Sequence, residues 1–246
     1  MSSEPGDPAG SDPGAVPAPT APGQEPPAPP PAPPAAPRQR FGALLLLLIA
    51  TYLLSAFTTG SLINAFQIVV FVGALLLALR NAHVATWLAR LVVVVVLAGS
   101  AVAFGLALAQ PSNAAAGAAE IWAGLVLLAA TAVIVHRVLA GTTVTLQSIY
   151  GAISAYMVIG LMFAAFYAAM NRLGSAPFFA NGQPGDTRTF QYFSFTTLTT
   201  LGYGDFTAAG NAGRAIAVME AMLGQIFLAT LVARLVSAFQ PSSRRQ

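Results

Sequence analysis

The chain has 246 residues, of which 56% are hydrophobic and only 8% are charged, and its formal net charge is +3. A composition this apolar is typical of membrane proteins. The absence of cysteine excludes disulfides and thiolate metal sites. All 11 Lys and Arg residues are arginine, and together with the many Ala, Gly and Pro residues this usage indicates a GC-rich bacterial genome.

Residues 1–40 are rich in Pro and Ala and have almost no large apolar side chains. Such a segment cannot bury enough surface to offset the entropy lost on ordering, so we expect a disordered tail. A Pro-rich docking ligand is the alternative interpretation. A signal peptide is not expected, because the segment begins with acidic residues and the first apolar run starts only at Phe41.

Six apolar runs follow, and each is near the length of about 20 residues that crosses a bilayer as a helix. Four of them fall within residues 41–140 and two within residues 141–246, at 41–57, 62–79, 91–108, 118–135, 146–170 and 215–239. The sequence therefore predicts an all-α membrane protein with six transmembrane helices, divided into a four-helix domain and a two-helix domain.

The arginines predict the orientation of these helices. If the six runs alternate in direction, the arginines flanking them fall on one side: Arg38, Arg40, Arg80, Arg90, Arg137, Arg234, Arg244 and Arg245. Positive residues mark the cytoplasmic side, so we expect a multi-pass protein of the cell membrane with both termini in the cytoplasm.

A short aromatic and threonine-rich run, residues 187–199, lies between the last two apolar runs. Asp186 precedes it as a candidate N-cap, after the turn-forming residues 181–185. The run is too short to cross a bilayer. It suits a re-entrant helix whose negative C-terminal end points at a cation.

The next residues read Thr200-Leu201-Gly202-Tyr203-Gly204-Asp205. Consecutive carbonyls that point to one side require a backbone that alternates between left- and right-handed angles, and glycine adopts the left-handed ones most cheaply. Rings of carbonyl oxygens can replace the hydration shell of a cation without trapping it. The four residues Gly-Tyr-Gly-Asp (202–205) are a weak signal by themselves, but here they follow a candidate re-entrant helix between two spanning runs.

This order, with the string T-T-L-G-Y-G-D, resembles the pore family of potassium channels over roughly the last hundred residues. The resemblance implies that K⁺ is the permeant ion, with no other cofactor. It would be held by the carbonyls of Thr200, Leu201, Gly202 and Tyr203 and by the Thr200 hydroxyl. The side chains of Leu201 and Tyr203 would point back into packing, Gly204 would complete the filter, and four chains would close the ring.

The resemblance also assigns residues around the filter. Asp205 would lie at the outer mouth, and with Tyr192, Thr196 and Thr199 it would support the filter. Some bacterial relatives have a glutamate where Thr196 stands, so we expect the support of Asp205 to come from the Tyr192 hydroxyl.

Three residues of the last run are candidates for gating. Gly224 lies at the distance from Gly204 that the family's hinge glycine has, and Gln225 falls on the helix face expected to line the cavity. Glu220 would point behind the filter, toward Thr196, Thr197 or a neighbouring tyrosine. It is either a carboxylate that tunes gating or a protonated, hydrogen-bonded acid.

Six crossings with the pore last resemble voltage-gated potassium channels, but residues 118–135 lack the repeated arginines of a sensor and are followed by Arg137 alone. We therefore expect a homotetrameric, potassium-selective channel without a voltage sensor. The alternatives are a nonselective cation channel and a nonconducting receptor or scaffold. An enzyme is not expected, because polar residues in the apolar runs are scattered singly. The expected partners are other copies of the chain and membrane lipids, with no nucleic acid and no cytoplasmic ligand-binding domain.

Overall fold

The structure is a computed structural model that describes residues 41–57, 70, 73, 93–102, 105, 112–140 and 144–238. In this part of the chain the labelled helices are α1 (Phe41–Phe57), α4 (Asn113–Ala140), α5 (Leu146–Leu173), α6 (Thr187–Leu198) and α7 (Asn211–Ala238). By length and composition, α4, α5 and α7 could each cross a membrane, whereas α1 and Val93–Val102 are shorter apolar helices. The described residues thus form a helical protein with three candidate membrane spans.

The predicted runs agree with these helices, with shifts at the ends. The first run coincides with α1, but the run predicted at 118–135 is part of the longer helix α4. Hydropathy missed the start of α4 because its first turn contains the polar Asn113 followed by alanines, and alanine favours a helix without being strongly apolar. The backbone N–H of Ala115 donates to Ser112 Oγ at 3.2 Å and so caps this end.

Several predictions concern residues outside the described part of the chain. The tail at 1–40 lies there entirely, the run at 62–79 for the most part, and the run at 91–108 in part. The predicted count of six transmembrane helices therefore stays a prediction.

Helix α5 is the centre of the described core, since it packs against α1, α4, α6 and α7. Its N-terminus is fixed by a capping box, in which the Ser148 N–H donates to the Thr145 hydroxyl and the Ser148 hydroxyl accepts from the Thr145 N–H. Small residues allow close packing along this helix. A Cβ at Gly160 would lie 2.7 Å from the Phe195 ring of α6.

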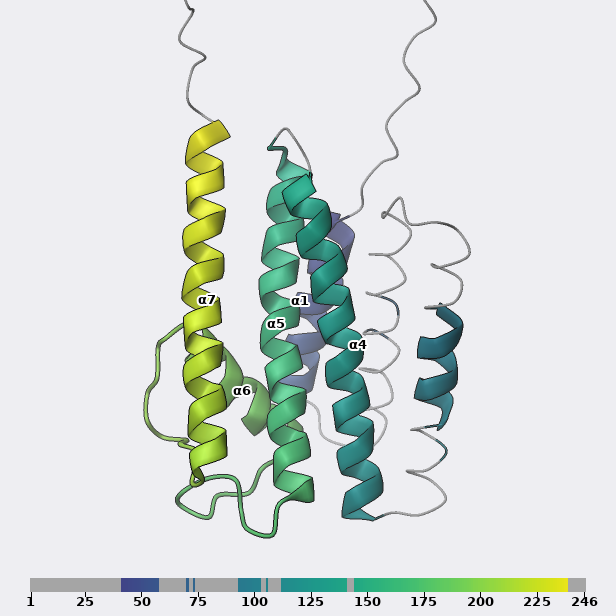
Figure 1. Cartoon of the computed structure of the whole chain (residues 1–246), viewed down its shortest axis with the longest axis vertical. Coiled ribbons are helices and arrows are strands. Elements are labelled where there is room, and N and C mark those ends of the chain that lie inside the picture. The colour runs from purple at the N-terminus through teal and green to yellow at the C-terminus, as the bar shows by residue number, and fades with distance from the viewer. Residues whose placement is uncertain are drawn as a thin grey trace, which may run out of the picture. The chain divides into compact units, whose positions relative to one another are not determined.

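Figure 1 shows that α5 ends where α7 begins, and that α6 lies between these two helices near that end. The loops on either side of α6 are joined by two backbone hydrogen bonds of 2.8 Å, from the Ala180 N–H to Thr207 O and from the Ala209 N–H to Phe178 O. The chain thus leaves α5, forms the short helix α6 and enters α7 from the same end of the helices.

Candidate functional site

The short helix α6 is anchored at its N-terminus by Asp186. The Asp186 carboxylate accepts hydrogen bonds of 2.8 Å from the Thr189 N–H and the Thr189 hydroxyl, and Arg188 forms an ion pair with it at 3.2 Å. Partial burial raises the pKa of the Asp186 carboxyl, but these hydrogen bonds and the Arg188 charge outweigh it, so the pKa lies below its usual value. The N-cap predicted from the sequence is confirmed by these contacts.

The body of α6 is held by aromatic packing. Phe190 and Phe193 are buried and belong to a cluster of rings with Phe178, Phe179 and Tyr167. Edge-to-face contacts dominate this cluster, which is the arrangement that ring quadrupoles favour. The cluster fixes the orientation of α6 and therefore of the loop that follows it.

The C-terminus of α6 is satisfied from a second helix. The Tyr156 hydroxyl of α5 donates to the Leu198 carbonyl at 3.0 Å, and the Thr199 hydroxyl donates to Phe195 O at 2.7 Å. The first contact satisfies a carbonyl that the end of the helix leaves without an intrahelical partner, whereas Phe195 O also accepts the backbone N–H of Thr199 at 3.1 Å. Sequence reasoning missed Tyr156, because nothing local in the sequence pairs it with Leu198.

The GYG loop, defined here as residues 200–205, has the alternating backbone that its sequence predicts. The φ angles of Thr200, Gly202 and Gly204 are 57°, 50° and 80°, whereas Leu201 and Tyr203 do not have positive φ. Every second residue is therefore left-handed. Thr200 is the only non-glycine residue of the described chain with a positive φ, and this conformation costs about 1–2 kcal/mol for an L-residue.

Two side chains hold the outer part of the GYG loop. The Tyr192 hydroxyl donates to Asp205 Oδ2 at 2.8 Å, which is the contact expected from the sequence. The Gln183 side-chain amide donates to the Asp205 carbonyl at 3.0 Å, and the rings of Tyr192 and Tyr203 are stacked with centroids 6.5 Å apart. At the inner part of the loop, Gln225 Nε2 of α7 donates to Thr200 Oγ1 at 3.3 Å.

Within one chain, the GYG loop faces open space on one side. The side chains of Leu201 and Tyr203 are 56% and 68% exposed, although the sequence led us to expect them in packing. Only the Tyr192 ring covers Tyr203 among the aromatic contacts of the described residues. If these two side chains are packed in the working protein, the packing surface must come from other molecules.

The environment of Glu220 differs in part from the prediction. Glu220 is fully buried, and its carboxyl group contacts the Tyr167 hydroxyl of α5 and the Ser194 hydroxyl of α6. The predicted partners were Thr196, Thr197 or a neighbouring tyrosine, and the tyrosine is confirmed as Tyr167. The Thr196 hydroxyl donates instead to Phe193 O of its own helix at 3.0 Å. Ser194, the second partner, lies two residues before Thr196 on α6, and no feature of the sequence singled it out.

Gly224 has a packing role that the sequence did not indicate. A Cβ at this position would lie 2.3 Å from the Leu198 carbonyl oxygen, so glycine is needed for α7 to approach the end of α6. The predicted hinge at Gly224 stays a prediction.

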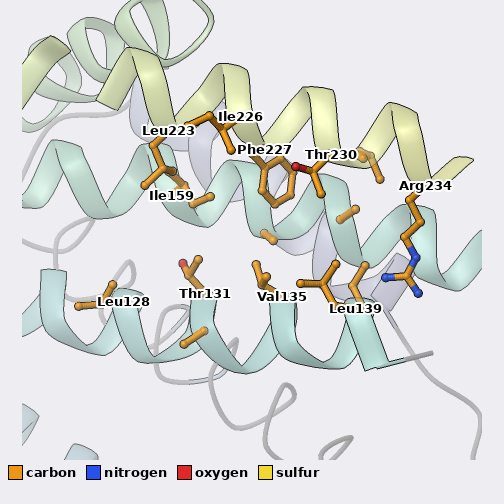
Figure 2. A pocket seen from close by; sticks show the side chains of 15 residues that line it. Leu128, Thr131, Val135, Leu139, Ile159, Leu223, Ile226, Phe227, Thr230 and Arg234 are labelled. Atoms are coloured by element: carbon orange, nitrogen blue, oxygen red, sulfur yellow. The ribbon is translucent and has the colours of Figure 1, made fainter. Parts of the chain in front are cut away.

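A separate apolar groove lies between α4, α5 and α7. Its volume is about 390 Å³, and no residue of the GYG loop lines it. Figure 2 shows side chains of α4 and α7 facing one another across it, with Arg234 at the end near Leu139. The groove is therefore distinct from the loop that carries the sequence motif.

Residues 155–240 match a family model described as an ion channel. This segment contains most of α5, all of α6 and the GYG loop, and α7. No curated protein and no solved structure matches the chain. The match supports an ion channel domain in this part of the chain, and with the apolar helices it supports a membrane protein with a role in ion transport.

Proposed function

We propose that the chain is one subunit of a homotetrameric, potassium-selective channel that conducts K⁺ passively. The observation that carries this proposal is the alternation of left-handed φ angles at Thr200, Gly202 and Gly204 in the sequence Thr-Leu-Gly-Tyr-Gly. A backbone that alternates in this way can point successive carbonyls toward the same side, as a site that replaces the water around a cation requires. The carbonyls of residues 200–203 and the Thr200 hydroxyl would be the ligands.

The chemistry of the loop favours a ring of subunits, and the resemblance to potassium channels gives their number as four. One chain supplies one wall of carbonyls, and several walls are needed to surround an ion, so a ring of identical subunits is the simplest closed arrangement. The exposed side chains of Leu201 and Tyr203 agree with this arrangement. Helix α7 agrees as well, because only 11% of its most apolar 18-residue stretch is buried within the chain. In this proposal, neighbouring subunits and lipid acyl chains cover these surfaces.

The short helix α6 would be the re-entrant pore helix. It has 12 residues, fewer than a membrane span needs, and its C-terminus leads directly into the GYG loop. The partial negative charge at a helix C-terminus favours a cation there. With the arginine distribution described above, the loop would face the outside of the cell membrane and both termini the cytoplasm.

Ion substitution tests the proposal. Purified protein in planar bilayers should give a reversal potential that follows the K⁺ gradient and is indifferent to the Na⁺ gradient. A reversal potential that follows both gradients would indicate the nonselective channel instead, and the absence of any flux would indicate a nonconducting protein.

Two glycine variants make this test specific to the loop. Gly202→Ala puts a side chain at a left-handed position and should abolish K⁺ conduction. Gly210→Ala is the matched control, because this glycine lies nearby with no neighbour within 4 Å and without a positive φ. Normal selective conduction by both variants would contradict the assignment of the filter.

A further inference from the structure

Glu220 joins three helices at a buried point behind the GYG loop. Its side chain is completely inaccessible, although it belongs to a helix that is otherwise largely exposed within the chain. The Tyr167 hydroxyl of α5 lies 2.7 Å from Glu220 Oε2, and Ser194 Oγ of α6 lies in hydrogen-bond contact with Glu220 Oε1. Ser194 Oγ also lies 2.6 Å from the Gly160 carbonyl oxygen of α5.

The hydrogens of this cluster can be counted. Three short oxygen-to-oxygen contacts need three protons, one for each contact. Tyr167 and Ser194 each carry a single hydroxyl proton, and the Gly160 carbonyl is only an acceptor. If Glu220 were ionised, one contact would bring together two oxygens with no proton between them. All three contacts are satisfied when the third proton is on Glu220 Oε1.

This count assigns a direction to each bond. The Tyr167 hydroxyl donates to Glu220 Oε2, the neutral acid donates from Oε1 to Ser194 Oγ, and Ser194 donates to the Gly160 carbonyl. The chain of donors begins on α5, passes through α7 and α6, and returns to α5.

The charges around Glu220 agree with this assignment. The ion pair found among the described residues joins Arg188 to Asp186 at the N-terminus of α6. It does not involve Glu220, so no arginine of this part of the chain is seen to neutralise that carboxyl group. Tyr167 is the titratable group that touches the carboxyl group, and it acts as a donor. An unpaired carboxylate buried among apolar side chains is far more costly than a hydrogen-bonded neutral acid.

We infer that Glu220 is held as the neutral acid and acts as a positioning residue that fixes the pore helix α6 between α5 and α7. The protonation state stands on the geometry alone. The positioning role rests on the proposed function, because it matters only if α6 sets the position of an ion-conducting loop.

Infrared spectroscopy tests the protonation state without any measurement of ion flux. The difference spectrum between the wild-type protein and Glu220→Gln, recorded in lipid vesicles near neutral pH, should contain the C=O stretch of a protonated carboxylic acid. A difference spectrum that shows only carboxylate stretches would overturn the inference.

Ser194→Ala tests the direction of the bonds and keeps the proposal testable if a Glu220 variant does not fold. The acid band should persist in this variant and move to higher wavenumber, because Oε1–H loses its acceptor. An acid band at the same wavenumber as in the wild type would overturn the assignment of Ser194 as the acceptor.

Two substitutions at position 220 test the positioning role. A glutamine side chain can donate to Ser194 and accept from Tyr167 as the neutral acid does, so Glu220→Gln should keep K⁺ flux within about twofold of the wild type. Glu220→Leu has a similar size but leaves the buried Tyr167 hydroxyl without its acceptor, and its flux should fall about tenfold or more. Equal loss in both variants would mean that a carboxylate charge is required and would overturn the inference.

Discussion

Replacing Gly224 with alanine tests whether close packing of α7 on the end of α6 holds the site together. An added Cβ would lie 2.3 Å from the Leu198 carbonyl oxygen and 2.9 Å from Leu198 Cδ1, roughly 1 Å short of an ordinary contact for the former. The carbonyl cannot easily move away, since it also accepts the hydrogen bond from the Tyr156 hydroxyl at 3.0 Å. The methyl group must therefore push α7 away from α6.

Two opposing effects set the size of the change. Alanine favours a helix over glycine by about 0.8–1 kcal/mol, whereas forcing extra volume into a packed contact costs about 1–3 kcal/mol. The difference between these two effects gives a net destabilisation of about 0–2 kcal/mol by Gly224→Ala. For a chain of this size this corresponds to a fall in the unfolding temperature of up to about 8 °C.

Thermal unfolding of the purified protein in lipid nanodiscs, followed by circular dichroism, measures this change. Gly105→Ala is the matched control, because Gly105 is also helical but has no neighbour within 4 Å among the described residues. The control should be unchanged or slightly more stable. If Gly224→Ala were as stable as this control, the packing role of Gly224 would be refuted. If the substitution changed only channel opening and left the unfolding temperature unaltered, the hinge would be favoured instead.

Three further predictions concern the cap of α6, the outer mouth and voltage. Asp186→Ala should destabilise the protein by about 1 kcal/mol at neutral pH. Because folding lowers the pKa of Asp186, the difference in stability between this variant and the wild type should shrink as the pH falls below the unfolded value of 3.8. The stability of Asp186→Asn, which can still cap the helix, should differ from that of the wild type in a way that depends less on pH. Thr207 is exposed three positions beyond Gly204 and has no aromatic ring, so external tetraethylammonium should block the channel weakly. Thr207→Tyr should strengthen the block by cation–π contact. Equal block of the two proteins would argue against this alignment of the outer mouth. Helix α4 has a single arginine, Arg137, in its last turn, whereas steep voltage gating needs about 3–4 charges per subunit. Gating currents should therefore be absent when permeant ions are removed. Any voltage dependence carried by the ions should survive Arg137→Gln.

Features that depend only on neighbouring residues could be predicted from the amino-acid sequence alone. The bounds of α1 and α6, the N-cap at Asp186 and the left-handed glycines at 202 and 204 could all be predicted, because hydropathy, capping and backbone freedom are local properties. The left-handed conformation of Thr200 was not singled out, since a threonine adopts it only when its surroundings impose it.

The side chains that meet behind the GYG loop could not be predicted, because they come from three different helices. Glu220 lies 26 residues after Ser194 and 53 residues after Tyr167, and no spacing in the sequence connects the three. A buried polar group must find a partner, but the packing of α5, α6 and α7 selects that partner. The same packing explains why Gly224 contacts Leu198, because the distance between two helices is set by the side chains on both of them.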